Sequence, residues 1–420
     1  MEILICLSAA LIGGLLLSRV AKRLKLPAVT AYLVTGLLLG PFCLGALGIS
    51  GLGFPSMEAV EGLNILSQVA LGFIAFTIGN EFRVSQLKTM GRQAIVVGIL
   101  QAVTATVLVD LALILLHLVR PEIISVSSAI TLGSIAAATA PAATLMVVRQ
   151  YKADGPMTRL LLMVVAIDDA VGLVLFSASF GVAVALESGS VSVVTVLVEP
   201  VVEILLSLGL GAAAGVALYW VEQFFHSRSK RLSISIGFVL LTAGLSMREF
   251  EVGGVRCGFS LLLVCMMTGT LFCNICDFSE ELMARVDGWT APLFVLFFVL
   301  SGAELDLSVL RNPSVLLIGV IYILVRSLGK YAGAYGSCAL TGCDEKIQKY
   351  LGVTLLPQAG VALGMAITAQ ALADGAVVRS VVLFSVLVYE LVGPALTKRA
   401  LLAAGEIQPE GRTSARKKNG

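Results

Sequence analysis

Apolar runs long enough to cross the hydrocarbon core of a bilayer, about 20 residues each, recur along the whole 420-residue sequence. Only 13% of the residues are charged, about half the share in an ordinary soluble domain. A β-barrel would instead show short segments of alternating hydrophobicity. The mean hydropathy of +0.97 also leaves too little polar surface to coat a soluble particle. The sequence therefore predicts an all-α, polytopic membrane protein.

The apolar runs predict 13 membrane-spanning helices. They cover residues 2–19, 27–44, 62–80, 94–118, 126–148, 159–186, 194–221, 232–247, 254–272, 290–304, 313–340, 348–372 and 379–401. A short polar segment follows the last run, and we expect no soluble regulatory domain after it.

The basic residues indicate how the chain is oriented, because cytoplasmic loops of membrane proteins are enriched in Lys and Arg. Of the 29 Lys and Arg residues, 22 follow odd-numbered spans or lie at the C-terminal end, and 5 follow even-numbered spans. We therefore expect the N-terminus outside the cell and the C-terminus in the cytoplasm, with an uncleaved first span in the cell (inner) membrane. The two remaining basic residues, Arg326 and Lys330, lie inside one span.

Two segments of the sequence repeat a pattern. Residues 79–87 and 302–310 both read G-x-E-apolar-x-apolar-S-x-L. The two copies lie seven predicted spans apart, and an odd offset reverses the orientation of the second copy in the membrane. Inverted-topology repeats of this kind build many secondary transporters.

The fifth and twelfth predicted spans each contain a segment that starts Leu-Gly, at 132–133 and 351–352, and meets a proline, Pro141 or Pro357, at mid-membrane. Proline removes a backbone donor and clashes with the preceding turn. Carbonyls freed at membrane depth need a partner, which a cation or a water-filled cavity can supply. Two ordinary proline kinks are the alternative, and their matching positions in the repeat argue against it. Gln358 follows the second proline and is a candidate neighbour of the site.

Asp168 and Asp169 lie side by side in the otherwise apolar sixth span. A carboxylate inside a membrane is costly unless it is paired, neutralised or hydrated, and such residues mark ion pathways. Adjacent residues of a helix point about 100° apart. The two aspartates are therefore expected to have separate roles, and we prefer this to a purely structural capping role.

Arg326 and Lys330 are spaced i, i+4, which puts both on one face of the eleventh span. A buried lysine loses its proton readily, so Lys330 is a candidate partner of one aspartate. Snorkelling of Lys330 to the membrane surface is the alternative. Arginine stays charged, and we expect Arg326 to form a structural ion pair with Glu81, Glu304 or a helix C-terminus.

Other polar residues give weaker signals. Asp110 is equally well explained as a hydrated position, and Glu203 and Glu390 are expected near span ends. Cys273 and Cys276 form a CxxC with no second pair at zinc spacing, so we expect packing rather than metal or redox chemistry. We expect no cofactor, and no nucleic-acid partner because the basic residues lie in short loops.

Several of these motifs are similar to those of one family. Residues 26–41, which read LPAVTAYLVTGLLLGP, resemble the second span of the cation:proton antiporter superfamily. The G-x-E ending of the third span, the Ala-Thr-Ala-Pro break, the adjacent aspartates and the R-x-x-x-K pair resemble it too. The resemblance runs from about residue 10 to residue 400. The aspartate pair together with a buried lysine resembles the electrogenic sodium/proton branch.

This resemblance implies a homodimer in which a dimerisation domain supports a six-helix transport core with two crossed, unwound helices. It makes Asp169 the main site for the transported monovalent cation and the proton. It makes Asp168 the partner of Lys330 beside that site and places Thr139 at the crossing. The implied division is a dimerisation domain at 1–93 and 231–312, a core at 94–186 and 313–401, a linker helix at 187–230 and a cytoplasmic tail at 402–420.

The expected function is exchange of Na⁺ or Li⁺ for protons by alternating access, with net movement of charge and a role in pH homeostasis. Potassium/proton exchangers share much of the pattern but often carry a long cytoplasmic nucleotide-binding domain. The crossing also lacks the acidic residue that some sodium antiporters place there. A sodium-coupled organic-anion transporter should lack the Asp-Asp and Lys combination, and a channel or sensor on the same scaffold would lack obligatory proton coupling. The sequence contains no HExxH or GxSxG motif, so we expect no enzyme activity.

Overall fold

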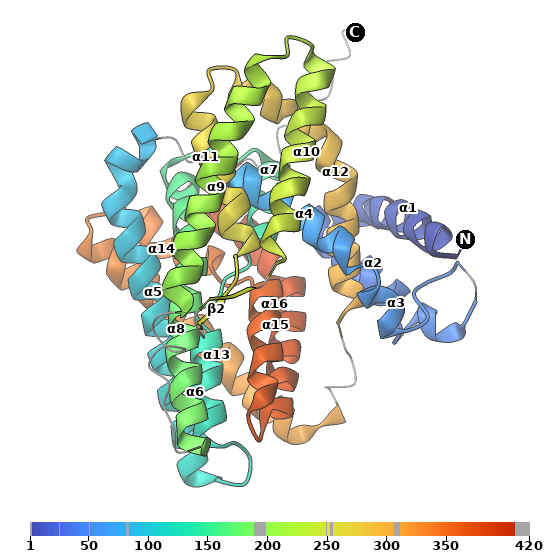
Figure 1. Ribbon diagram of the computed structural model, residues 1–420. Coiled ribbons are helices and arrows are strands. Elements are labelled where there is room, and N and C mark those ends of the chain that lie inside the picture. The colour runs from blue at the N-terminus through green and yellow to red at the C-terminus, as the bar shows by residue number, and fades with distance from the viewer. Residues whose placement is uncertain are drawn as a thin grey trace.

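The computed structural model describes residues 2–24, 26–49, 51–80, 84–188, 199–248, 250–252, 255–305 and 311–407, and helices dominate these ranges (Figure 1). The α-helices are α1 (Glu2–Arg23), α2 (Ala28–Leu39), α3 (Met57–Glu61), α4 (Asn64–Asn80), α5 (Val84–Val119), α6 (Val126–Ile135), α7 (Pro141–Tyr151), α8 (Pro156–Ser188), α9 (Glu199–Gln223), α10 (Arg228–Ser246), α11 (Leu261–Ile275), α12 (Ser279–Ala303), α13 (Pro313–Leu340), α14 (Glu345–Thr354), α15 (Gly360–Thr368) and α16 (Gly375–Ala404). The shorter elements are the 3-10 helices η1 (Leu44–Leu47) and η4 (Ala369–Ala371) and the strands β1 (Phe250–Val252) and β2 (Val255–Cys257).

The multi-pass, all-α prediction is confirmed. Within the described ranges, eight helical segments are long and apolar enough to cross a membrane, namely α1, α2 with η1, α5, α8, α9, α12, α13 and α16. Shorter apolar helices lie between them, including α4, α6, α11 and α15. Every predicted span overlaps at least one of these helices. The exact number of crossings stays a prediction.

The two halves of the chain contain the same succession of elements. A long helix, a broken helix and a second long helix follow one another as α5, α6–α7 and α8. The same order returns as α13, α14–α15 and α16. The repeated G-x-E motif cannot be compared as a whole, because residues 81–83 and 306–310 lie outside the described residues.

The helices pack in two groups. In one, α5 packs on α13, α6 and α8, while α14 and α16 pack on α13 and on each other. In the other, α11 packs on α4 and α9, and α12 packs on α2 and α4. The division into a transport core and a dimerisation domain stays a prediction.

Small residues let helices of the second group approach closely. Gly36 of α2 lies against the backbone carbonyl of Val299 in α12, and Gly269 of α11 lies against that of Phe76 in α4. A Cβ atom at either glycine would collide with that carbonyl. Close backbone approach of this kind is how helices associate in lipid, where the hydrophobic effect gives little attraction between them.

One element is additional to the predicted helices. Strands β1 and β2 form an antiparallel pair between α10 and α11, with Phe250 opposite Cys257. The prediction extended an apolar span over residues 254–272, whereas helix α11 begins at Leu261. The side chain of Ser260 caps α11 by accepting a hydrogen bond from the Leu263 backbone N–H at 3.4 Å.

Candidate functional site

The two broken helices meet where their chains are unwound. Helix α6 ends at Ile135 and α7 begins at Pro141, while α14 ends at Thr354 and α15 begins at Gly360. The backbone N–H of Ala140 donates a hydrogen bond to the carbonyl of Pro357 at 2.8 Å. The predicted pair of crossed, discontinuous helices is therefore confirmed.

The prolines act differently at the two breaks. Pro141 is the first residue of α7, where its missing N–H would have no partner within the helix in any case. Pro357 lies within the unwound segment between α14 and α15, and its carbonyl accepts the hydrogen bond from Ala140 of the other broken helix. Each break exposes backbone carbonyls at the C-terminal end of a half-helix, which carries partial negative charge. A cationic side chain placed there donates hydrogen bonds to the free carbonyls and offsets the partial negative charge.

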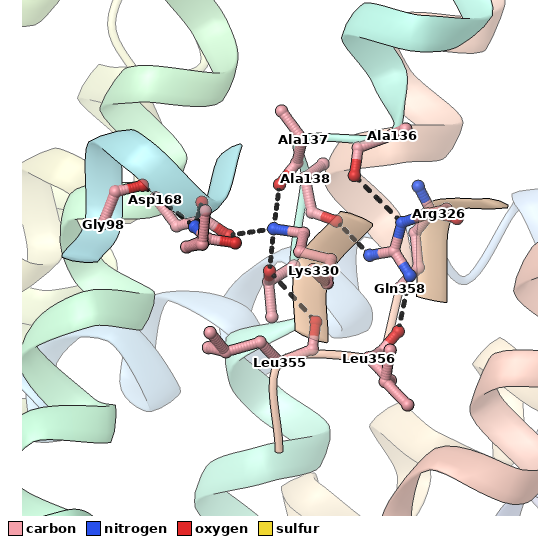
Figure 2. A network of polar contacts seen from close by, with 12 residues as sticks. Gly98, Ala136, Ala137, Ala138, Asp168, Arg326, Lys330, Leu355, Leu356 and Gln358 are labelled. Atoms are coloured by element: carbon pink, nitrogen blue, oxygen red, sulfur yellow. Dashed lines mark hydrogen bonds and ion pairs between the residues drawn. The ribbon is translucent and has the colours of Figure 1, made fainter. Parts of the chain in front are cut away.

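Lys330 of α13 fills one of these positions (Figure 2). Its Nζ atom donates to the carbonyl of Ala137, to Thr139 Oγ1 at 2.8 Å and to Asp168 Oδ2 at 3.1 Å. The side chains of Lys330 and Asp168 are both completely buried. The structure thus brings together an aspartate of α8, a lysine of α13 and the unwound segment of the fifth span, and Lys330 does not snorkel to the surface.

The second carboxylate oxygen of Asp168 has a partner that the sequence analysis missed. Gln101 of α5 donates from Nε2 to Asp168 Oδ1 at 2.5 Å and to the carbonyl of Gly98 at 2.9 Å. Gln101 is fully buried. In the sequence, Gln101 stands out only as an amide side chain inside an apolar span. Asp168 therefore has a donor on each oxygen, one neutral and one cationic.

Arg326 lies one turn before Lys330 and contacts backbone carbonyls from both broken helices (Figure 2). Its Nε atom donates to the carbonyl of Ala136 at 3.0 Å, and its Nη2 atom donates to that of Ala138 at 2.6 Å. Its Nη1 atom donates to the carbonyl of Leu356 at 2.7 Å. The guanidinium also lies 4.5 Å from the ring centroid of Tyr389.

Among the described residues, Arg326 is bound by backbone carbonyls and not by a carboxylate. The helix C-terminus, one of the three partners considered, is the one observed, and it is supplied by two half-helices at once. In the described part of the chain, Arg326 forms no ion pair with Glu304, and Glu81 lies outside the described residues. A planar guanidinium suits carbonyls that diverge in direction, because its donors point outward as a fixed fork.

Gln358 also supports the crossing. Its Nε2 atom donates to the carbonyl of Ile135 at 3.0 Å and to Tyr322 Oη at 2.9 Å. Its Oε1 atom accepts a hydrogen bond from Ser385 Oγ at 2.9 Å. The side chain is completely buried and links four segments. The candidate neighbour of the site therefore holds the two unwound segments against α13 and α16.

Asp169 has a different environment from Asp168. Its Oδ1 atom has no hydrogen-bond partner among the described residues. Asp169 lines a cavity of about 250 Å³ whose walls come from α8, α9, α11 and α15. Glu203 and Thr368 line the same cavity. The two neighbouring carboxylates thus differ, since one has its donors supplied by the protein and the other is open to a cavity.

The start of α8 is held by a residue that the sequence analysis did not single out. Glu406, just after α16, accepts hydrogen bonds from the backbone N–H groups of Met157 and Thr158, both at 2.7 Å. These donors have no partner inside the helix, and a carboxylate there also opposes the positive end of the helix dipole. Glu406 therefore ties the helix that carries the aspartates to the end of α16.

Comparison with known proteins identifies the family. The family described as sodium/hydrogen exchanger, transmembrane, matches residues 7–403. The chain belongs to the sodium/hydrogen exchanger family. Members of this family are multi-pass membrane transporters rather than enzymes.

Solved structures show the same fold. Two structures of the sodium proton antiporter MjNhaP1 from Methanocaldococcus jannaschii match with TM-scores of 0.67 and 0.69, at 21% and 19% identity. The first match covers 97% of this chain and 99% of the other, and the second covers 94% and 96%. A glutathione-regulated potassium-efflux system protein of Haemophilus influenzae is 23% identical over 332 residues. That match covers 77% of this chain and 49% of the relative, so the chain spans about half its length.

A second cavity in this exchanger lies nearer the start of α8. It has a volume of about 740 Å³ and is lined by residues of α2, α7, α8 and α12, among them Arg149 and Asp287. Arg149 Nη1 of α7 lies 3.0 Å from Asp287 Oδ1 of α12, and Gln150 Oε1 accepts a hydrogen bond from the Ala28 backbone N–H at 2.8 Å. These two contacts join the group of helices that holds the aspartates to the other group. Neither aspartate lines this cavity.

The remaining candidates show no resident metal site. In the part of the chain that the structure describes, no group of three His, Cys, Asp or Glu side chains could hold a metal ion. Cys273 and Cys276 are both buried, and Cys273 Sγ donates to the carbonyl of Thr270 at 3.2 Å within α11.

Proposed function

We propose that this exchanger moves Na⁺ or Li⁺ in one direction and protons in the other by alternating access, and that Asp169 binds both. One observation carries the proposal. Asp169 lines a cavity and has a buried carboxylate oxygen without a partner among the described residues, directly beside the buried Asp168–Lys330 ion pair. A carboxylate in this position is costly unless a cation or a proton occupies it.

Competition for this carboxylate couples the two fluxes. A cation binds only when Asp169 has lost its proton, and a proton binds only when the cation has left. A core that moves with either ligand, but poorly with none, exchanges one for the other. Such movement of one group of helices against another is common among transporters built from inverted repeats.

The Asp168–Lys330 pair provides a route to net charge movement. A cation bound at Asp169 attracts the neighbouring carboxylate of Asp168. This attraction weakens the ion pair between Asp168 and Lys330. An ammonium group without its counter-ion in a buried site gives up its proton readily. One cation would then replace two protons, and the exchange would be electrogenic.

The two cavities fit this cycle, because they lie on either side of the aspartates along α8. We place the Asp169 cavity on the outer side of the cell membrane and the larger cavity on the cytoplasmic side, following the charge bias of the loops. In this arrangement the N-terminus is outside, the C-terminus is cytoplasmic and two copies form a homodimer through the helix group that contains α2, α4, α11 and α12.

Exchange of K⁺ for protons is the second candidate. It is favoured by the similarity to a potassium-efflux system protein and by the Thr139-Ala140-Pro141 crossing, which has no acidic side chain. Cation choice depends on how many oxygens surround the ion and how far apart they are held. The charge of the carboxylates attracts all monovalent cations and does not by itself select Na⁺ over K⁺.

Purified protein in liposomes decides between these functions. With a proton-sensitive dye inside, addition of Na⁺ or Li⁺ outside is expected to drive proton movement, and K⁺ is expected to be much less effective. Proton movement driven only by K⁺ would replace the sodium assignment. No proton movement with any of the three cations, across several pH values and membrane potentials, would rule out cation/proton exchange.

Lys330→Gln is expected to make the exchange weak or electroneutral. Glutamine can donate to the unwound segment but cannot release a proton, so the second proton of the cycle is lost. The measurement is the membrane-potential dependence of exchange in proteoliposomes. Lys346→Gln, at an exposed position in the first turn of α14, is the matched control and should behave as the wild type. If charge movement is unchanged in Lys330→Gln, Lys330 has no part in proton release.

A further inference from the structure

Glu390 of α16 is a buried acid outside the Asp168–Asp169 site. It is 4% exposed, and its Oε2 atom has no hydrogen-bond partner among the described residues. An ionisable side chain inside a membrane-spanning helix is energetically costly and is usually functional. A buried acid without a function could be replaced by leucine or glutamine at lower cost, so its presence indicates a function.

Two further acids extend from Glu390 toward the surface. Glu304, at the end of α12, lies close enough to Glu390 for repulsion between their charges, and Glu61 stands in the same relation to Glu304. Exposure increases along this series, because Glu390 is buried, Glu304 is partly buried and Glu61 is exposed at the end of α3. We call these three residues the acidic file.

Among the described residues, the Oε2 atom of Glu390 is left without a basic hydrogen-bond partner. Helices α2, α6 and α15, which pack on α16, contain no Asp, Glu, Lys, Arg or His. Among the basic groups of the other neighbours, Arg326 and Lys330 bind the unwound segments, and Arg149 binds Asp287. The charged residues of α14 lie in its first turns, away from the crossing. Glu304 is therefore the charged group whose field reaches Glu390.

The turn of α16 that carries Glu390 touches the crossing. The ring of Tyr389, the preceding residue, lies under the Arg326 guanidinium, and its Oη atom is 2.8 Å from Ser327 Oγ. One turn later, Gly393 lies against the ring of Pro357. A change of charge at Glu390 therefore acts on a helix that directly supports the unwound segments.

The internal repeat gives an independent reason to single out this position. Helices α8 and α16 are the corresponding third members of the two halves. Counted from Pro156, Asp169 is residue 14 of α8, and counted from Gly375, Glu390 is residue 16 of α16. The buried acid of the second half thus lies within one helical turn of the position that corresponds to the aspartates.

The surroundings of Glu390 suit a proton better than a metal cation. A bound cation needs several oxygen ligands gathered around it. The acidic file is extended, and no three acidic, His or Cys side chains in the described ranges are close enough together to hold an ion. A proton needs a single carboxylate oxygen, and it also removes the repulsion from Glu304.

We propose that Glu390 is a second proton-binding carboxyl of this exchanger, loaded past Glu61 and Glu304 and coupled to the movement of α16 against α12. The proposal rests on the proposed exchange function for its role in the transport cycle. The binding of the proton itself is a property of the resting protein and can be measured without transport.

Infrared difference spectroscopy tests the binding. Purified wild-type protein is titrated across neutral pH, and the C=O stretch of a protonated carboxyl is followed. Part of that band should disappear in Glu390→Gln and remain, at a shifted position, in Glu390→Asp. Glu122→Gln, an exposed acid in the loop after α5, is the matched control and should leave the band unchanged. Spectra of Glu390→Gln identical to those of the wild type would overturn the proposal.

The pH profile of exchange tests the coupling. Glutamine resembles the protonated, uncharged carboxyl and cannot lose a proton, so Glu390→Gln should lose the fall in exchange rate that accompanies deprotonation of Glu390 in the wild type. Glu304→Gln should instead shift the profile in the opposite direction, to lower pH, because without the repulsion from Glu304 the Glu390 carboxyl loses its proton at lower pH. A profile that superimposes on the wild type would overturn the coupling. If the wild type exchanges no cation, the proposed function fails, while the infrared band still decides whether Glu390 binds a proton.

Discussion

Asp169→Asn is expected to reduce cation-driven proton movement to the level of protein-free liposomes. Asparagine keeps the size of the side chain but removes both the negative charge and the exchangeable proton. The Asp168–Lys330 pair remains, yet Asp168 already has a donor on each oxygen. The open cavity would therefore end at a neutral amide, and neither ligand would have a binding group there. The measurement is the dye signal after addition of Na⁺ or Li⁺ at several pH values.

A matched substitution separates this loss from a general effect of the mutation. Asp277→Asn changes the same residue type at an exposed position between α11 and α12, and Asp277 lines neither of the two cavities. It should exchange at the wild-type rate. Asp169→Asn should also elute and melt like the wild type, since the change relieves a buried charge. Full exchange by a correctly folded Asp169→Asn protein would refute the assignment of Asp169.

The helix breaks could be predicted because proline chemistry is local. Pro141 and Pro357 have no backbone N–H to donate within a helix. Their neighbours are small enough for the two segments to approach each other. The structure adds what a local rule cannot supply, namely that the two breaks meet and share the bond between Ala140 and Pro357. The matched positions in the repeat were the signal that pointed to a common location.

The partners of the buried charges were harder to predict. A sequence shows that Arg326 is buried and needs acceptors, and carboxylates are the obvious ones. The structure instead supplies carbonyls that exist as free acceptors only because two helices end at the crossing. Gln101 and Glu406 were missed for a related reason, since each acts on a residue of α8 from a distant part of the chain.

Replacing Arg326 is expected to have the largest effect on stability. In Arg326→Met the carbonyls of Ala136, Ala138 and Leu356 lose their donor while they stay buried. Each buried acceptor left without a partner costs about 1–3 kcal/mol. The negative ends of the two half-helices would keep Lys330 as the cation at the crossing but would lose the charge of the guanidinium. The variant should therefore lose several kcal/mol of stability, on the order of the sum of these penalties.

The melting temperature of detergent-solubilised protein measures this loss. Arg326→Lys should be intermediate, because an ammonium group keeps the charge but cannot reach carbonyls that point in different directions. Ser327→Ala, which removes only a hydroxyl contact with Tyr389 from the neighbouring position, is the control and should melt within a few degrees of the wild type. The order of melting temperatures is thus expected to be wild type, Ser327→Ala, Arg326→Lys and Arg326→Met. An Arg326→Met protein as stable as Ser327→Ala would mean that the crossing is held by the packing of Gln358 and Pro357, and that the guanidinium contributes little to it.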